Sequence, residues 1–121
     1  MATIKAYTDL QQSKKLAEIL PLKSADMCCF QNQNGDINYY GFPFLQGNKT
    51  CNPIPCWSLA ALISVLPKID NYRLEIRRIE SGYCCCYTEE NNGGDLYWYY
   101  ADNPINACVA MVEKLNELNL L

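Results

Sequence analysis

Cys56 has the position expected of a catalytic nucleophile. It precedes Trp57 at the expected start of an apolar helix, and a helix N-terminus lowers the pKa of a thiol. A Cys-Trp pair at a helix start is also typical of one class of cysteine peptidase. Those enzymes require a histidine base, and the chain contains no histidine. We therefore predict a structural role for Cys56 and no catalytic residue, with a cysteine-dependent enzyme as the alternative.

The eight cysteines could also bind zinc, which needs four thiolates when no histidine is present. Cys51 and Cys56 are separated by four residues, and Cys84 and Cys86 share one face of an expected strand. This spacing departs from that of the usual zinc-binding cysteine pairs. We expect the cysteines to pack as free thiols, so the sequence predicts neither a metal nor any other cofactor.

Acidic side chains cluster around Gly93-Gly94, where two of them could act as a general acid and base. The cluster consists of Glu89, Glu90 and Asp95. An acidic turn is usually just solvated, and we favour that interpretation, with a carboxylate-dependent enzyme as the alternative. The glycine pair lacks the lysine and the helix of a phosphate-binding P-loop.

The arginines of the chain, Arg73, Arg77 and Arg78, lie within six residues. Arg73 and Arg77 are expected on one face of a strand, because side chains alternate along it. Guanidinium groups there could bind a phosphate or a carboxylate. The commoner arrangement is a solvated face on which both arginines flank Glu75 and form weak surface ion pairs.

Aromatic residues at 96–100 make a further candidate surface. In a strand, Tyr97 and Tyr99 point to one face, while Trp98 and Tyr100 point to the other. One face can fill the core, and the other then meets a helix, another subunit, a ligand or water. Aromatic rings beside arginines could hold a flat anionic molecule such as a nucleotide. The predicted ligand-binding residues are Arg73, Arg77, Tyr97, Tyr99 and Tyr39.

Length and composition restrict the class of protein. With 121 residues the chain has the size of one domain, which we expect to cover residues 1–121. Half of its residues are hydrophobic, but no apolar run reaches the ~20 residues that cross a bilayer, and no secretory signal is recognisable. The net charge of −3 provides no general attraction for nucleic acids or anionic lipids. We expect a soluble, cytoplasmic protein with no membrane partner.

Apolar periodicity predicts an α+β fold with the order αββαβββα. A capping box of Thr8 and Gln11 starts the first helix, which ends before Pro21. Asn34-Gly35 joins two strands into a hairpin. The expected helices cover 10–20, 55–66 and the residues from Pro104 onward, and the expected strands cover 27–31, 37–42, 72–77, 83–88 and 96–101. We therefore expect a mainly antiparallel sheet, made of a hairpin and a three-stranded meander and packed with three helices, with a long loop at 43–55.

Several segments resemble proteins of one family. They are KAYTD at 5–9, QSKKLAEILP at 12–21, SADM at 24–27, PCWSLAAL at 55–62, DNP at 102–104 and ACV at 107–109. These segments are similar to a group of small uncharacterised proteins encoded by gut Bacteroidales and their phages or prophages. The resemblance implies a setting, a bacterial cytosol during phage infection, and it implies no catalytic or binding residue.

Three classes of function follow from the sequence. The preferred hypothesis is a non-catalytic binding protein, and in the phage setting it would sequester a small anionic or nucleotide ligand, or mask a host protein, in counter-defence. The second is a small cysteine- or carboxylate-dependent enzyme. The third is a homo-oligomer with a structural role.

Overall fold

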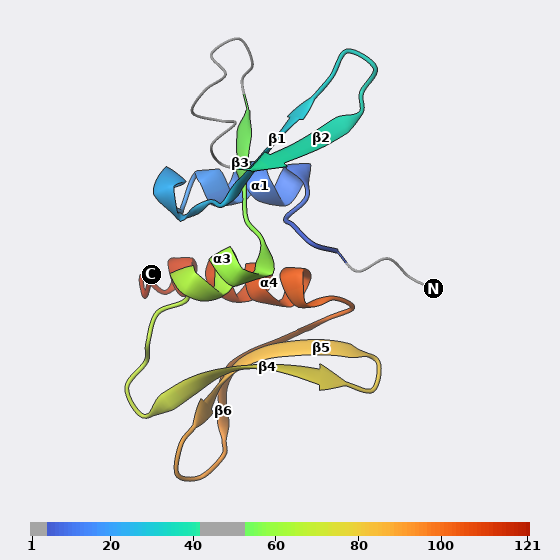
Figure 1. Cartoon of the computed structure of the whole chain (residues 1–121). Helices are drawn as coiled ribbons and strands as arrows, with labels where there is room; N and C mark the ends of the chain where they lie inside the picture. Colours follow the sequence, from blue (N-terminus) through green and yellow to red (C-terminus); the bar gives the residue numbers. More distant parts are fainter. Residues whose placement is uncertain (1–4, 42–52) are drawn as a thin grey trace.

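Two three-stranded antiparallel sheets lie at opposite ends of the molecule, and the helices lie between them (Figure 1). The computed structural model describes residues 5–41 and 53–121. The N-terminal sheet has the strand order β2-β1-β3, and the C-terminal sheet has the order β4-β5-β6. The elements are α1 (Leu10–Ala17), a 3-10 turn (Leu22–Ser24), β1 (Met27–Gln31), β2 (Ile37–Gly41), β3 (Ile54–Cys56), α3 (Leu59–Val65), β4 (Tyr72–Ile79), β5 (Gly82–Glu89), β6 (Asp95–Ala101) and α4 (Pro104–Glu117).

The predicted α+β class and element order are confirmed, with β3 added. The hairpin turn forms where it was predicted. Gly35 has a φ of 89°, and the Asn32 side chain accepts hydrogen bonds of 2.9 Å from the N–H groups of Asn34 and Asp36. A glycine adopts this left-handed conformation without steric cost. Residue 42 of the second expected strand, and most of the expected loop at 43–55, lie outside the described residues.

The second helix was predicted to begin at Pro55, and this boundary is wrong. Residues 54–56 form β3 instead, pairing with β1 so that Cys56 lies opposite Met27. Ser58 caps α3, because its side chain accepts a hydrogen bond of 3.2 Å from the Ala61 N–H. A serine at the N-cap stabilises a helix start, while proline is tolerated in an edge strand, where its missing N–H is not needed. Cys56 is therefore a strand residue, two positions before the cap of α3.

The predicted capping box of the first helix is displaced by one residue. Asp9 is the N-cap, and it exchanges hydrogen bonds with Gln12. Thr8 is fully buried, and its hydroxyl accepts a hydrogen bond of 3.1 Å from the Trp57 N–H and lies 2.8 Å from the Ser13 hydroxyl. The Thr8 hydroxyl therefore joins the start of α1 to the segment after β3. Asp9, the next residue, caps the helix.

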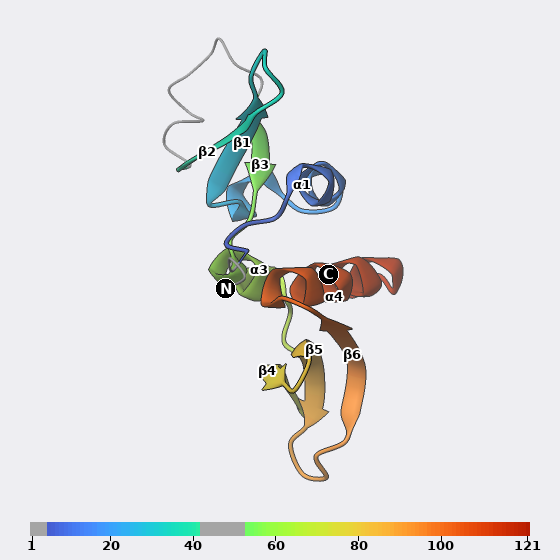
Figure 2. The same cartoon turned by 90° about the vertical axis from the view of Figure 1, so that its right-hand side faces the viewer.

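The hydrophobic core surrounds α4, which packs against α1, α3 and the C-terminal sheet. Figure 2 shows α3 and α4 crossing the molecule between the two sheets, with α1 beside the N-terminal sheet. Ile105, Met111 and Leu115 of α4 are fully buried, as is Trp57. Removing a buried aromatic side chain such as Trp57 typically costs about 3–5 kcal/mol. In the described part of the chain, no helix is both long enough and apolar enough to cross a bilayer.

A cluster of polar side chains also joins the start of α1 to the start of α4. Lys5 Nζ donates hydrogen bonds to Asp9, Gln12 and Asn106, at distances of 3.0, 2.8 and 3.0 Å. Gln12 Nε2 also donates to Asn106 Oδ1 at 2.8 Å. Since Asn106 lies in the first turn of α4, this cluster fixes α1 against α4.

A candidate binding surface on the C-terminal sheet

Alternation along the strands gives the C-terminal sheet two different faces. The inner face packs against the core through Tyr72, Leu74, Ile76, Cys85, Tyr87, Leu96, Tyr97, Tyr99 and Ala101. The other face, here called the outer face, carries Arg73, Glu75, Arg77 and Ile79 of β4, Cys84, Cys86 and Thr88 of β5, and Asp95, Trp98 and Tyr100 of β6. The α4 helix packs against the part of the inner face that β5 and β6 form (Figure 2), so the outer face is the one more available for binding.

Two aromatic side chains stand out from the outer face. Trp98 is 58% exposed and Tyr100 is 49% exposed. The Tyr100 hydroxyl lies 3.0 Å from Ser81 Oγ and 3.2 Å from the Ser81 carbonyl oxygen. A Cβ added at Gly82 would lie 3.2 Å from Cε2 of Tyr100. The Tyr100 ring is therefore fixed over a glycine. Trp98 is the next β6 residue on the same face, and it lies opposite Cys86 of β5.

A charged network occupies the other part of the outer face. Glu75 accepts hydrogen bonds from Arg73 Nε at 3.0 Å and from Arg77 Nε at 2.9 Å. Arg77 also reaches Asp95 at 3.0 Å and the Thr88 hydroxyl at 2.6 Å. Two guanidinium groups and two carboxylates thus share one network, and their formal charges cancel.

Hydrogen bonding within this network lowers the pKa of both carboxyl groups. The hydrogen bond from Arg77, followed by those from Arg73 and Thr88, lowers the pKa of Glu75 to about 2. The hydrogen bond from Arg77, followed by that from Thr88, lowers the pKa of Asp95. Both carboxylates therefore stay ionised at neutral pH, and neither has the raised pKa of a general acid.

The thiols of the described residues are free and buried. Burial raises the pKa of the Cys84 thiol to about 11. Burial, together with the neighbouring Cys29, also raises the pKa of Cys56 above its usual value. Because the thiolate is the reactive form, the Cys56 thiol is a poor nucleophile at neutral pH. Among the described residues, no group of three Cys, Asp or Glu side chains is arranged to hold a metal ion.

The five residues predicted to bind a ligand occupy three places in the structure. Arg73 and Arg77 lie on the outer face, whereas Tyr97 and Tyr99 lie on the inner face against the core. Tyr39 belongs to the other sheet, where its ring stacks on Tyr7 at a centroid distance of 5.2 Å. The structure therefore places the arginines with a different pair of aromatic residues from the pair that was predicted.

The aromatic residues that accompany the arginines are Trp98 and Tyr100. Simple alternation of side chains along β6 does not predict this arrangement, because the strand contains a bulge. Without the bulge, Leu96 would lie on the same face as Trp98. At Tyr97 the chain has a φ of 49°, and the pairing with β5 shifts between Cys86 and Tyr87. The extra residue lets Leu96, Tyr97 and Tyr99 all face the core. A bulge of this kind commonly has glycine at the positive-φ position, so the tyrosine gives no sequence signal for it.

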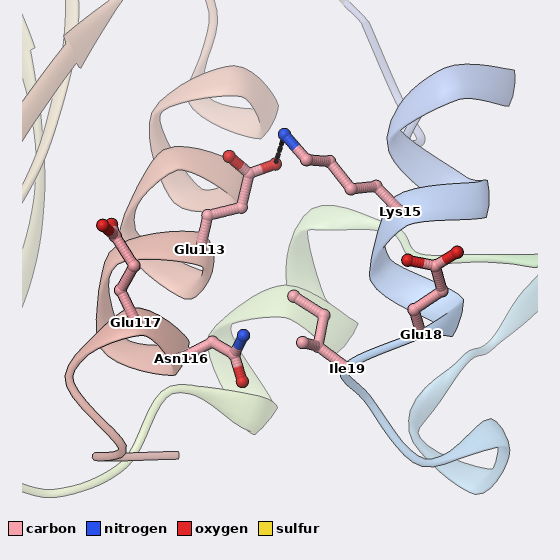
Figure 3. A pocket seen from close by; sticks show the side chains of 6 residues that line it. All are labelled: Lys15, Glu18, Ile19, Glu113, Asn116 and Glu117. Carbon is pink, nitrogen blue, oxygen red and sulfur yellow. Dashed lines mark ion pairs between the residues drawn. The ribbon is translucent and has the colours of Figure 1, made fainter.

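A shallow groove lies between α1 and the C-terminal half of α4 (Figure 3). It has a volume of about 320 Å³ and is lined by Lys15, Glu18, Ile19, Glu113, Asn116 and Glu117. Lys15 Nζ lies 3.4 Å from Glu113 Oε1 across the groove. The groove is acidic overall, and it contains neither a thiol nor one of the residues predicted to bind a ligand.

Comparison with known proteins adds no functional assignment. No family model, no curated protein and no solved structure matches this chain.

Proposed function

We propose that this chain is a non-catalytic binding protein that uses the outer face of its C-terminal sheet to contact another protein. The observation that carries the proposal is the pair of half-exposed rings, Trp98 and Tyr100, which share the outer face of the sheet with Arg73 and Arg77. Tryptophan, tyrosine and arginine are the residue types that contribute most to binding at protein interfaces. The sheet holds them in place before binding, which reduces the entropy lost on association.

The charge of the outer face favours a protein over a small anionic ligand. Arg73 and Arg77 are paired with Glu75, and Arg77 also with Asp95. A phosphate approaching this network would have to compete with two ionised carboxylates for the guanidinium groups. A protein surface can instead cover the rings and leave these ion pairs intact at the rim of the interface.

The buried thiols argue against the enzymatic alternative. Cys56 is fully buried in β3, and its raised pKa keeps it protonated. Asp95 is ion-paired, and Glu89 accepts a hydrogen bond from Asn92 at 3.3 Å, so the acidic residues around the glycine turn have different partners. With no histidine in the chain, a cysteine nucleophile would also lack its usual base. In the phage setting that the sequence resemblance implies, the partner would be a host protein.

The proposal is tested by comparing binding partners of matched variants. The parent chain, a Trp98→Ala/Tyr100→Ala variant and a Leu22→Ala control are immobilised and exposed to the same Bacteroidales lysate. Leu22 is a suitable control because it is 55% exposed and lies in the 3-10 turn after α1, away from the outer face. A partner retained by the parent and the control but lost by the double variant is then purified. Its affinity should fall by at least about 30-fold in the double variant, the effect of removing a hot spot.

Two results would contradict the proposal. One is that no protein distinguishes the parent from the double variant. The other is thermal stabilisation of the parent by a nucleotide from a panel, with loss of that stabilisation in an Arg73→Ala/Arg77→Ala variant. The second result would support the small anionic ligand in place of a protein.

A further inference from the structure

The free edge of β4 is unusually open to pairing with another strand. β4 is eight residues long, and among the described strands only β5 pairs with it. Exposed sheet edges are commonly protected by short length, proline, a bulge or charged side chains. β3 has three residues and contains Pro55, and β6 has its bulge at Tyr97. β4 is neither short nor bulged and contains no proline, and its charges are of both signs, so they can pair with those of a second copy.

The backbone groups that face this edge follow from the pairing with β5. Glu90 N–H donates to the Asn71 carbonyl at 3.0 Å, so Asn71 forms a hydrogen-bonded pair. Such pairs alternate along an antiparallel ladder. Arg73, Glu75 and Arg77 are then also bonded to β5, and the N–H and C=O groups of Leu74 and Ile76 point to the free edge.

The sequence of β4 is complementary to itself in one antiparallel register. If a two-fold axis passes through Leu74, the Leu74 residues of two copies lie opposite each other, and Tyr72 lies opposite Ile76 of the second copy. On the other face, Arg73 lies opposite Glu75 of the second copy. Apolar residues thus meet apolar residues, and opposite charges meet, which stabilises cross-strand pairs.

The hydrogen-bonding requirement also agrees with this register. The two Leu74 residues exchange N–H···O=C bonds, and at each end the Ile76 N–H of one copy reaches the Tyr72 carbonyl of the other. The Tyr72 N–H is already used, because it donates to the Ile69 carbonyl at 3.0 Å. A two-fold axis at Glu75 would engage the same edge-facing backbone groups, but it would place Arg73 opposite Arg77 and the two Glu75 residues opposite each other, so like charges would meet.

We propose that the chain forms a two-fold symmetric dimer by antiparallel pairing of β4 with β4 of a second copy, with the axis at Leu74. The two C-terminal sheets then form one continuous six-stranded sheet. Both outer faces lie on the same side of this sheet, because odd-numbered residues of one β4 lie opposite odd-numbered residues of the other. The dimer does not depend on the proposed function, because it uses the strand edge and leaves Trp98 and Tyr100 of both copies exposed.

Disulfide trapping tests the register. In a Cys51→Ser background, separate Arg73→Cys and Glu75→Cys proteins are mixed and oxidised with a glutathione couple. Positions 73 and 75 of opposite copies form a non-hydrogen-bonded pair, whose short separation suits a disulfide. The mixture should form a disulfide-linked heterodimer, whereas each protein alone should not. The matched mixture of Arg77→Cys with Glu75→Cys should not crosslink, because those positions meet only when the axis lies at Ile76.

Sedimentation velocity of the parent chain provides the measurement that needs no variant. We expect a monomer–dimer equilibrium. Arg73→Glu should weaken the dimer by about tenfold, because it places glutamate opposite Glu75 in both of the symmetric 73/75 pairs. The Arg73→Glu/Glu75→Arg double variant should recover most of that loss. A parent that stays monomeric up to its solubility limit would overturn the dimer, and crosslinking of the 77/75 mixture in place of the 73/75 mixture would overturn the register.

Discussion

Tyr100 lies across Gly82, and the two residues fit only because position 82 has no side chain. A Cβ at this position would come 2.4 Å from the Ala101 carbonyl oxygen and 3.2 Å from Cε2 of Tyr100. The neighbouring atoms include the backbone of β6, which cannot move aside easily. This contact sets the position of the aromatic ring and joins β5 closely to β6.

Gly82→Ala should therefore destabilise the protein. Overpacking a well-packed site costs about 1–3 kcal/mol, and we expect an effect of this size in the free energy of unfolding measured with urea. Gly94→Ala is the matched control, because a Cβ there has no atom within 4 Å. Equal stability of the two variants would show that the close contact at Gly82 is absent in solution.

Glu75→Gln should change how stability depends on pH. The folded-state pKa of Glu75, about 2, lies below its ordinary value of 4.5. The stabilising effect of the carboxylate is therefore complete above pH 4.5 and is lost as the pH falls toward 2. The Tm of Glu75→Gln should lie below that of the parent at pH 6, and the difference should shrink between pH 4.5 and 2. The exposed Glu90→Gln provides the control, and a constant difference across this range would contradict the network.

Asn103→Ala should remove the cap of α4. The Asn103 side chain accepts a hydrogen bond of 2.8 Å from the Asn106 N–H, and replacing an N-cap by alanine costs about 1 kcal/mol. Asn103→Ser retains a capping oxygen and should lose much less stability in the same urea titration. If serine and alanine were equivalent, the cap would not contribute to folding.

The two tryptophans should differ in their access to solvent. Trp57 is fully buried and Trp98 is 58% exposed, so acrylamide should quench mainly the fluorescence of Trp98. Trp98→Phe should remove the readily quenched component and shift the remaining emission to shorter wavelength. Similar quenching in the parent and in Trp98→Phe would mean that Trp98 is covered in solution, which neither the fold nor the proposed dimer predicts.

Cys56 should be unreactive in the folded protein. In a Cys51→Ser background, the remaining seven thiols are all buried, and they should react with a thiol reagent at pH 7 only after denaturant is added. Site-specific mass spectrometry identifies each modified residue. Rapid modification of Cys56 alone in the native state would revive the nucleophile hypothesis.

Much of the fold could be predicted from local patterns. The Asn34-Gly35 turn, the alternation in β4 and the start of α4 at Pro104 each depend on residues close in sequence. The errors arose where tertiary contacts decided between neighbouring positions. Thr8 was predicted as part of a cap, but the buried Trp57 N–H uses its hydroxyl, and Pro55 became a strand residue because β1 lies beside it.

The candidate surface was only partly predictable for a similar reason. Placing Arg73 and Arg77 on one face needed only alternation, and the structure has them on one face. Deciding which aromatic residues share that face required knowledge of the bulge at Tyr97, whose φ of 49° is unusual for a bulky residue. The neutralising role of Asp95 depends on a contact with Arg77 across the sheet, which the spacing along the chain does not indicate.

The position of α4 after the last strand of the C-terminal sheet has a consequence for truncated chains. Its buried side chains fill the core beneath the C-terminal sheet, and Asn106 holds Lys5 and Gln12. A chain that stops at Ala101 contains all of the described strands, but it lacks the helix that packs against β5 and β6 on the inner face of the C-terminal sheet. A premature stop codon in the short segment between Ala101 and α4 would therefore leave apolar surface of this sheet exposed, so the truncated product should be a substrate for chaperones and proteases.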